Sequence, residues 1–117
     1  MDTIRRKQGA ELDPIIFEHR VAGVAIDFTA GDWAGATFVL AVAPLSTGTA
    51  VSGGGFPKTT GFTALTDGVQ VDWATTSELN ALTPGPYIIQ CRARRNDGRH
   101  LDFAPVHLDL DPSLIAP

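Results

Sequence analysis

The chain has 117 residues, of which 44% are hydrophobic and 19% are charged, and its formal net charge is −4. This is the length of one ordinary domain, which can hold its own core without disulfides or metals. The acidic balance argues against a general nucleic-acid binder, which would carry a basic patch or stripe. No apolar run follows the basic N-terminal residues, and no window approaches the roughly 18 apolar residues of a membrane helix. We therefore expect a soluble protein made in the cytoplasm, with no nucleic-acid or membrane partner.

The chain opens with short strand candidates broken by turns. Residues 3–8 (TIRRKQ) are predicted to form a strand that ends at Gly9, and residues 11–19 (ELDPIIFEH) form a second candidate. Pro14 inside the second candidate indicates an edge strand or the beginning of a strand, since proline cannot donate to a ladder. A turn is expected next, at Gly23.

Residues 24–35 (VAIDFTAGDWAG) predict a strand that ends at a corner. Ile26 and Phe28 share one face, and Asp27 lies on the other. The polar and small residues that follow break the strand before Trp33. A tryptophan in such a corner usually closes one end of a core, and we prefer this interpretation to a ligand-stacking role.

Residues 36–43 (ATFVLAVA) are apolar throughout and lie between Gly35 and Pro44. A run of this length predicts a strand buried on both faces. Such a strand would be central in a packed pair of sheets, or a partner chain would cover one of its faces. Residues 44–60 follow as a loose excursion whose three glycines lack the ending of a phosphate loop. We expect Phe56 to anchor this excursion to the core.

Two more strands and a short helix are predicted in the second half of the chain. Residues 61–66 (GFTALT) and 69–73 (VQVDW) flank an Asp67-Gly68 pair, which is a strong hairpin signal. Residues 75–83 (TTSELNALT) have hydroxyl residues that can cap a helical turn, leucines three apart, and a proline after them.

The clearest pattern runs from Pro84 to Leu110 and predicts a long hairpin. Residues 96–98 (Asn-Asp-Gly) supply its turn, because these residue types tolerate positive φ. A change of phase beside Pro105 predicts a bulge or bend in the returning strand. Alternating residues on the first strand are expected to face inward: Tyr87, Ile89, Cys91 and Ala93.

These elements predict an all-β fold. About seven short strands, one short helical turn over residues 75–83 and no strand–helix alternation are typical of an immunoglobulin-like antiparallel β-sandwich. We expect one domain over residues 1–110, followed by an extended tail over residues 111–117.

No motif for chemistry emerges from the sequence. The histidines lack the spacing of a zinc site, and the single cysteine, Cys91, is expected to behave as a small buried hydrophobe. His100 with Asp102, and His107 with Asp109, could each hold a metal weakly, but exposed polar strand faces explain them better. No nucleophile elbow occurs, and nothing in the sequence shows the paired carboxylates of a glycosidase cleft. We therefore expect no catalytic, cofactor-binding or metal-binding residues.

Two short basic clusters stand out against the acidic balance of the chain. We interpret both as solvated strand faces in preference to anion or nucleic-acid contacts. The clusters are Arg5, Arg6 and Lys7, and Arg92, Arg94 and Arg95.

The order of three segments resembles a family of small tail-associated proteins of tailed bacteriophages and prophages. Residues 4–17 (IRRKQGAEL…IIF) resemble that group's basic–Gln–Gly opening and the apolar strand after it. Residues 25–44 are similar to its corner that leads into a hydrophobic strand, with one residue more at 27–31. Residues 68–110 resemble its closing strand, Thr-rich turn, Gly-x-Tyr and hairpin. The domain in question is the immunoglobulin-like fold at the N-terminus of siphophage baseplate upper proteins.

The resemblance implies a non-enzymatic structural protein of a phage or prophage tail or baseplate. Its partners would be other tail proteins, with a possible homo-oligomer, and it would use no cofactor. It would be made in the host bacterial cytoplasm and end in the virion. The alternative is a carbohydrate- or ligand-binding β-sandwich that exposes Trp33, Trp73 or Tyr87 as a stacking platform, although Trp73 is predicted to point inward. An enzyme is the third hypothesis, and no motif favours it.

Overall fold

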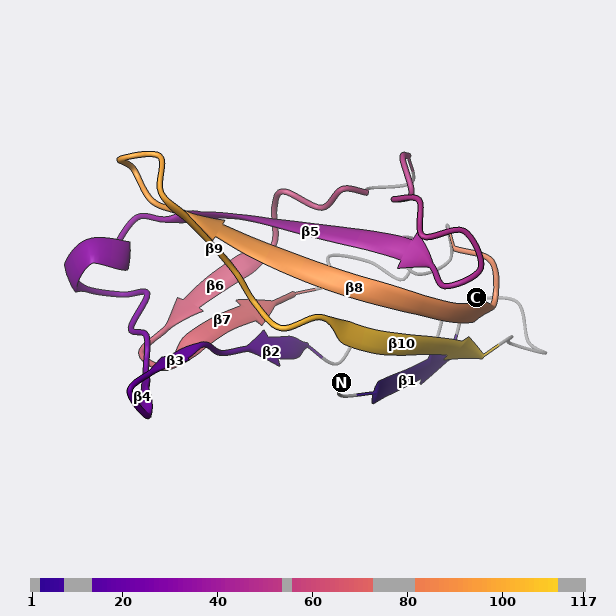
Figure 1. Ribbon diagram of the computed structural model, residues 1–117, viewed down its shortest axis with the longest axis horizontal. Helices are drawn as coiled ribbons and strands as arrows, with labels where there is room; N and C mark the ends of the chain where they lie inside the picture. Colours follow the sequence, from indigo (N-terminus) through magenta and orange to yellow (C-terminus); the bar gives the residue numbers. More distant parts are fainter. Residues whose placement is uncertain (1–2, 8–13, 54–55, 73–81, 112–117) are drawn as a thin grey trace.

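Two β-sheets share one core in the computed structural model, which describes residues 3–7, 14–53, 56–72 and 82–111 (Figure 1). The strands in chain order are β1 (Thr3–Lys7), β2 (Ile15–Phe17), β3 (Arg20–Val21), β4 (Val24–Ala25), β5 (Thr37–Pro44), β6 (Phe62–Leu65), β7 (Gly68–Val71), β8 (Gly85–Arg94), β9 (His100–Asp102) and β10 (Val106–Asp111). A short 3₁₀ turn, η1 (Gly31–Trp33), precedes β5.

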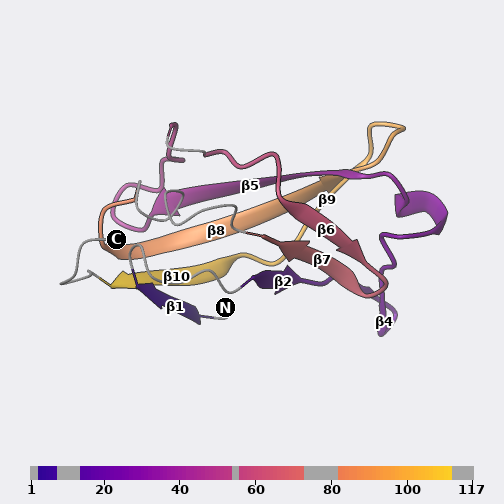
Figure 2. The same ribbon diagram turned by 180° about the vertical axis from the view of Figure 1, so that it is seen from behind.

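The pairing of the strands is that of an immunoglobulin-like sandwich. The larger sheet has the order β1-β10-β8-β5, with β9 also on β8, and the smaller sheet has the order β2-β7-β6. β1 runs parallel to β10, and the other pairs are antiparallel. The chain thus places β2, β6 and β7 in one sheet and β5, β8 and β10 in the other, which is the immunoglobulin division. The predicted fold class is confirmed, and Figure 2 shows the smaller sheet in front of β8.

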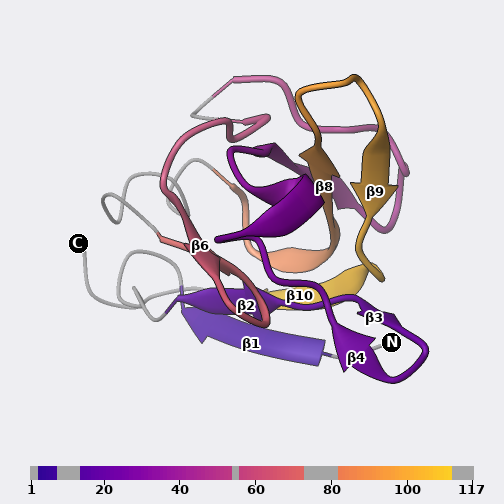
Figure 3. The ribbon, with the colours of Figure 1, turned by 90° about the vertical axis from the view of Figure 1, so that its left-hand side faces the viewer.

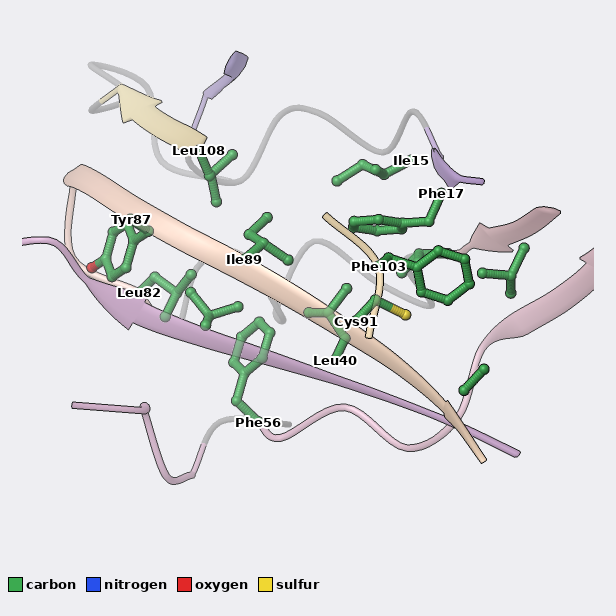
Figure 4. Packing of buried hydrophobic residues seen from close by; sticks show 14 of the residues in the cluster. Ile15, Phe17, Leu40, Phe56, Leu82, Tyr87, Ile89, Cys91, Phe103 and Leu108 are labelled. Carbon is green, nitrogen blue, oxygen red and sulfur yellow. The ribbon is translucent and has the colours of Figure 1, made fainter. Parts of the chain in front are cut away.

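β8 is the longest strand and supplies the centre of the core. Its burial alternates as predicted, because successive side chains point to opposite faces of a strand. The inward residues Tyr87, Ile89, Cys91 and Ala93 are each at most 3% exposed. Each large apolar side chain buried in this way contributes about 1.5–3 kcal/mol. Figure 4 shows Tyr87, Ile89 and Cys91 in the same cluster as Leu40, Phe56 and Phe103.

Tyr87 fixes the entry into β8. Its ring is buried, and its hydroxyl donates to the Thr83 carbonyl oxygen at 2.5 Å. The Thr83 hydroxyl lies 3.1 Å from the same phenol oxygen. A tyrosine near the start of this strand that bonds back to the chain a few residues upstream is a tyrosine corner, a recurrent feature of immunoglobulin-like sandwiches.

The strand that follows the β8–β9 turn is interrupted where the alternation of apolar and polar residues shifts by one position. β9 ends at Asp102 and β10 begins at Val106, so the predicted bend at Pro105 is confirmed. The break turns Phe103 into the core, where its amide donates to the Cys91 carbonyl oxygen at 2.9 Å. Its ring packs against Phe17 of the opposite sheet, with centroids 5.8 Å apart.

The predicted central position of residues 36–43 is wrong. β5 is an edge strand, paired to β8 on one side, and its outer-face residues are only half-buried or exposed. The excursion over residues 44–60 returns to cover its other side. Leu40 and Lys58 exchange two backbone hydrogen bonds of 2.9 Å, and the Val51 amide donates to Val42. Phe56 is 4% exposed, which confirms that it anchors this excursion.

The β6–β7 hairpin forms at the predicted place, with a different turn. Leu65 pairs with Gly68, so Thr66 and Asp67 make the loop and Gly68 already belongs to β7. Gly68 has an ordinary φ, and what requires glycine there is a neighbouring strand. A Cβ at this position would lie 2.2 Å from the Phe17 carbonyl oxygen of β2.

Several expectations fall outside the described residues. Trp73, most of the helical turn predicted over residues 75–83 and most of the tail predicted over residues 111–117 belong to this group. Asp111, the first residue of the predicted tail, is the last residue of β10. Pro14 precedes β2, an edge strand of the smaller sheet, as predicted.

Among the described residues, no helix is long and apolar enough to cross a membrane.

Candidate functional site

A shallow groove runs along the outer face of β5 and β8. We define the β5–β8 groove by the outward residues of β5, by their partners on β8, and by part of the 44–60 excursion. Three hollows make it up, of about 410, 190 and 180 Å³. The first and second share Val39 and Arg92, and the second and third share Ala41 and Gln90, so the groove is continuous.

Cross-strand register explains the shape of the groove. The outward residues of β5 are small: Thr37, Val39, Ala41 and Ala43. Their partners on β8 are longer: Arg94, Arg92, Gln90 and Ile88. The small side chains therefore form the floor, and the long ones form one wall. Thr59, Gly48 and Ala50 of the excursion line the opposite side.

The end of the groove nearest the β8–β9 turn is basic. Arg92 holds Asp102 through two hydrogen bonds, Nε to Oδ1 at 2.6 Å and Nη2 to Oδ2 at 3.1 Å. Hydrogen bonding to this guanidinium lowers the pKa of Asp102. Arg94, one pair further along, is exposed and has no ion pair within the described part of the chain. Its strand neighbours are Thr37 and His100.

The third arginine of the predicted basic cluster has a structural role. Arg95 places its guanidinium carbon 5.5 Å from the centroid of the Trp33 ring, within the range of a cation–π contact. Its Nη2 also lies 2.9 Å from Oδ2 of Asp97. Trp33 packs edge-on against Phe28 at 5.7 Å. Trp33 is half-buried and packs against the core, as predicted for a residue that closes one end of it.

The same end of the molecule carries η1, the β8–β9 turn and the β3–β4 hairpin (Figures 1 and 3). Val21 and Val24 on this hairpin are 59% and 69% exposed. Nearby, Asp27 accepts hydrogen bonds from the Thr29 hydroxyl and amide, which lower the pKa of its carboxyl group. These bonds shape the corner between β4 and η1, and they explain the polar residues there.

The residues considered as weak metal candidates do not gather into a larger cluster. No three histidine, cysteine or acidic side chains converge within the ranges that the structure describes. His107 Nε2 lies 3.3 Å from Asp109 Oδ1, without the geometry of a hydrogen bond. Cys91 is fully buried, and this desolvation raises the pKa of its thiol to about 12. A buried thiol that stays protonated is a poor nucleophile at neutral pH.

Sequence reasoning missed Lys58, a lysine that is only 3% exposed. Its ammonium group lies near Asp72, and its charge contributes to lowering the pKa of that carboxyl. The larger causes are hydrogen bonds from Thr63 and Gln70, at 2.7 and 2.6 Å. Because the backbone of Lys58 pairs with β5, this residue ties the excursion to both sheets.

Comparisons with known proteins do not assign the chain to a family. No family model matches it, and a search of curated proteins finds no match. The crystal structure of CopC from Methylosinus trichosporium OB3b is similar at 15% identity and a TM-score of 0.37, over 88% of this chain and 100% of that one. A likeness this distant carries no conclusion about function.

Proposed function

We propose that this chain is a non-enzymatic structural protein of a phage or prophage tail or baseplate, which acts by binding other tail proteins. The β5–β8 groove is the observation that carries an interaction role. It leaves Val39, Ala41, Ala43 and Ile88 half-buried on the outer face of the larger sheet. Apolar side chains left open in this way are typical of surfaces that meet another protein.

The described part of the chain favours contact over chemistry. Its hollows are shallow and open, its histidines and carboxylates do not converge, and its cysteine is buried. The assignment to a tail is supported by the order of segments over residues 4–17, 25–44 and 68–110, which resembles small tail-associated proteins.

The direct test is mass spectrometry of particles. Tails or virions purified by density gradient from an induced culture of the source strain should contain peptides of this chain. Their amount should be stoichiometric with that of known tail proteins. A deletion strain, complemented in trans, is the matched control for tail assembly by electron microscopy. Particles that lack the chain and assemble normally without it would overturn the tail assignment.

Light scattering of the purified protein adds an independent measurement. We expect a defined oligomer at high concentration, or a monomer that enters a complex when purified tail proteins are added. Oligomers in closed assemblies bury the same surface in every copy. The variant Ala41→Glu should reduce association, because it places a charge on the floor of the groove.

A further inference from the structure

We infer that the β5–β8 groove binds an extended acidic segment of a partner protein, with a carboxylate against Arg94 and small apolar side chains over Val39 and Ala41. This inference rests on the proposed interaction role and names the chemistry of the partner. Three features of the groove carry it: its repeat, its charge and the closure of the neighbouring sheet edge.

The repeat of the floor matches an extended chain. Successive outward residues of a strand stand about 6.7 Å apart, and an extended peptide presents alternate side chains at the same spacing. From Thr37 to Ala43 the floor therefore spans roughly 20 Å, the length of about six extended residues. Small side chains fit over its Val39 and Ala41 positions, which line one continuous hollow with Gln90 and Arg92.

The charge of the groove selects an anionic partner. Arg92 is neutralised by Asp102, but the neighbouring Arg94 has no counter-charge among the described residues. Thr37 and Thr59 line the same hollow and can donate hydrogen bonds beside it. A carboxylate fits this set, because a guanidinium forks onto a carboxylate with two hydrogen bonds. The exposed position of Arg94 keeps the cost of desolvation low.

The partner must bind through side chains, because the edge of β5 is already paired. Lys58 bonds to Leu40 in both directions, and Val51 donates to Val42. Addition of a strand to this edge would displace the 44–60 excursion, with Phe56 buried at its end. Docking on the face leaves these bonds intact.

The test uses the whole chain, labelled with ¹⁵N, and two synthetic peptides observed by NMR. One peptide is acetylated and alternates threonine and valine after two glutamates, and the other carries two lysines in their place. We expect the glutamate peptide to shift the amides over Thr37–Ala43 and Ile88–Arg94. It should bind at least roughly fivefold more tightly than the lysine peptide at low salt.

Two charge-reversal variants distinguish binding through Arg94 from a general effect of the protein's charge. Arg94→Glu should lower the affinity for the glutamate peptide by roughly fivefold and favour the lysine peptide. Arg99→Glu is the matched control, since Arg99 is 76% exposed on the β8–β9 turn outside the groove, and it should bind as the parent chain does. Equal affinities for the two peptides, shifts elsewhere, or no binding of either peptide would overturn the inference.

This result is separable from the test of the tail role. Particles that contain the chain while the groove binds neither peptide would refute the acidic partner and leave the tail assignment standing. Peptide binding in a chain that is absent from particles would do the reverse.

Discussion

At the scale of the residue, the phenol of Tyr87 provides the sharpest stability test. Tyr87→Phe removes the donor to the carbonyl oxygen of Thr83, a part-buried hydrogen bond. Losing an intramolecular hydrogen bond of this kind costs about 0.5–1.5 kcal/mol, so the midpoint of urea unfolding should fall with an unchanged slope. The control Thr83→Ser retains a hydroxyl and should cost less. A Tyr87→Phe variant as stable as the parent would show that the corner contributes nothing.

The Arg92–Asp102 pair makes a prediction about pH. The folded pKa of Asp102 lies below its unfolded value, chiefly because of its hydrogen bond to Arg92. The pair therefore stabilises the fold above the unfolded pKa of about 3.9, and this contribution is lost as the pH falls through the folded pKa. Asp102→Asn should be slightly less stable than the parent at pH 7, and the difference should shrink as the pH falls below the unfolded pKa.

Chemical unfolding at pH 7 and pH 2.5 measures this difference. Asp32→Asn is the matched control, since Asp32 is exposed on η1 and has no ion pair in the described part of the chain. A difference between Asp102→Asn and the parent that persists unchanged in acid would show that the amide disturbs something other than the ion pair.

At the scale of the element, Gly68 sets the distance between β7 and β2. Gly68→Ala would place a methyl group 2.2 Å from the Phe17 carbonyl oxygen, so the two strands must separate. We expect a loss of about 1–3 kcal/mol or more in the free energy of unfolding. Gly98→Asn is the control, because Gly98 has a positive φ and open space around it, and asparagine tolerates that conformation. Equal stabilities for the two variants would contradict this explanation.

The elements differ in how far the sequence could predict them. The inner face of β8 and the bend at Pro105 follow from local alternation, which the sequence carries directly. The edge position of β5 does not, because a strand's neighbours depend on residues far along the chain. Here Lys58 returns to cover Leu40, and no local pattern records that pairing. The apolar run over residues 36–43 therefore predicts a central strand, and this prediction is wrong.

The candidate site shows the same limit. The sequence singles out Arg92, Arg94 and Arg95 as one cluster. Only the register across β8 and β9 shows that Arg92 is paired with Asp102, and only the corner at η1 places Arg95 over Trp33. What remains for a ligand is Arg94, and nothing in the local sequence distinguishes it from its neighbours.

At the scale of the whole molecule, Cys91 reports whether the sandwich opens as one unit. Its thiol is fully buried between the sheets, and burial raises its pKa to about 12. Labelling by a thiol reagent at pH 8 should therefore be at least about a thousandfold slower than for a free thiol. Because the centre of β8 is exposed only when both sheets separate, the labelling rate should rise with urea along the slope of global unfolding.

A labelling rate that does not rise with urea would identify a part of the sandwich that opens without global unfolding. Labelling that is fast and insensitive to urea would mean that β9 or β5 detaches from β8 without global unfolding. Both strands flank Cys91, through the register of Ala93 with Leu101 and of Cys91 with Leu40. The variant Phe56→Ala separates these routes, because it loosens the excursion that covers β5 and leaves β9 untouched. Faster labelling in this variant at low urea would assign the opening to the β5 edge.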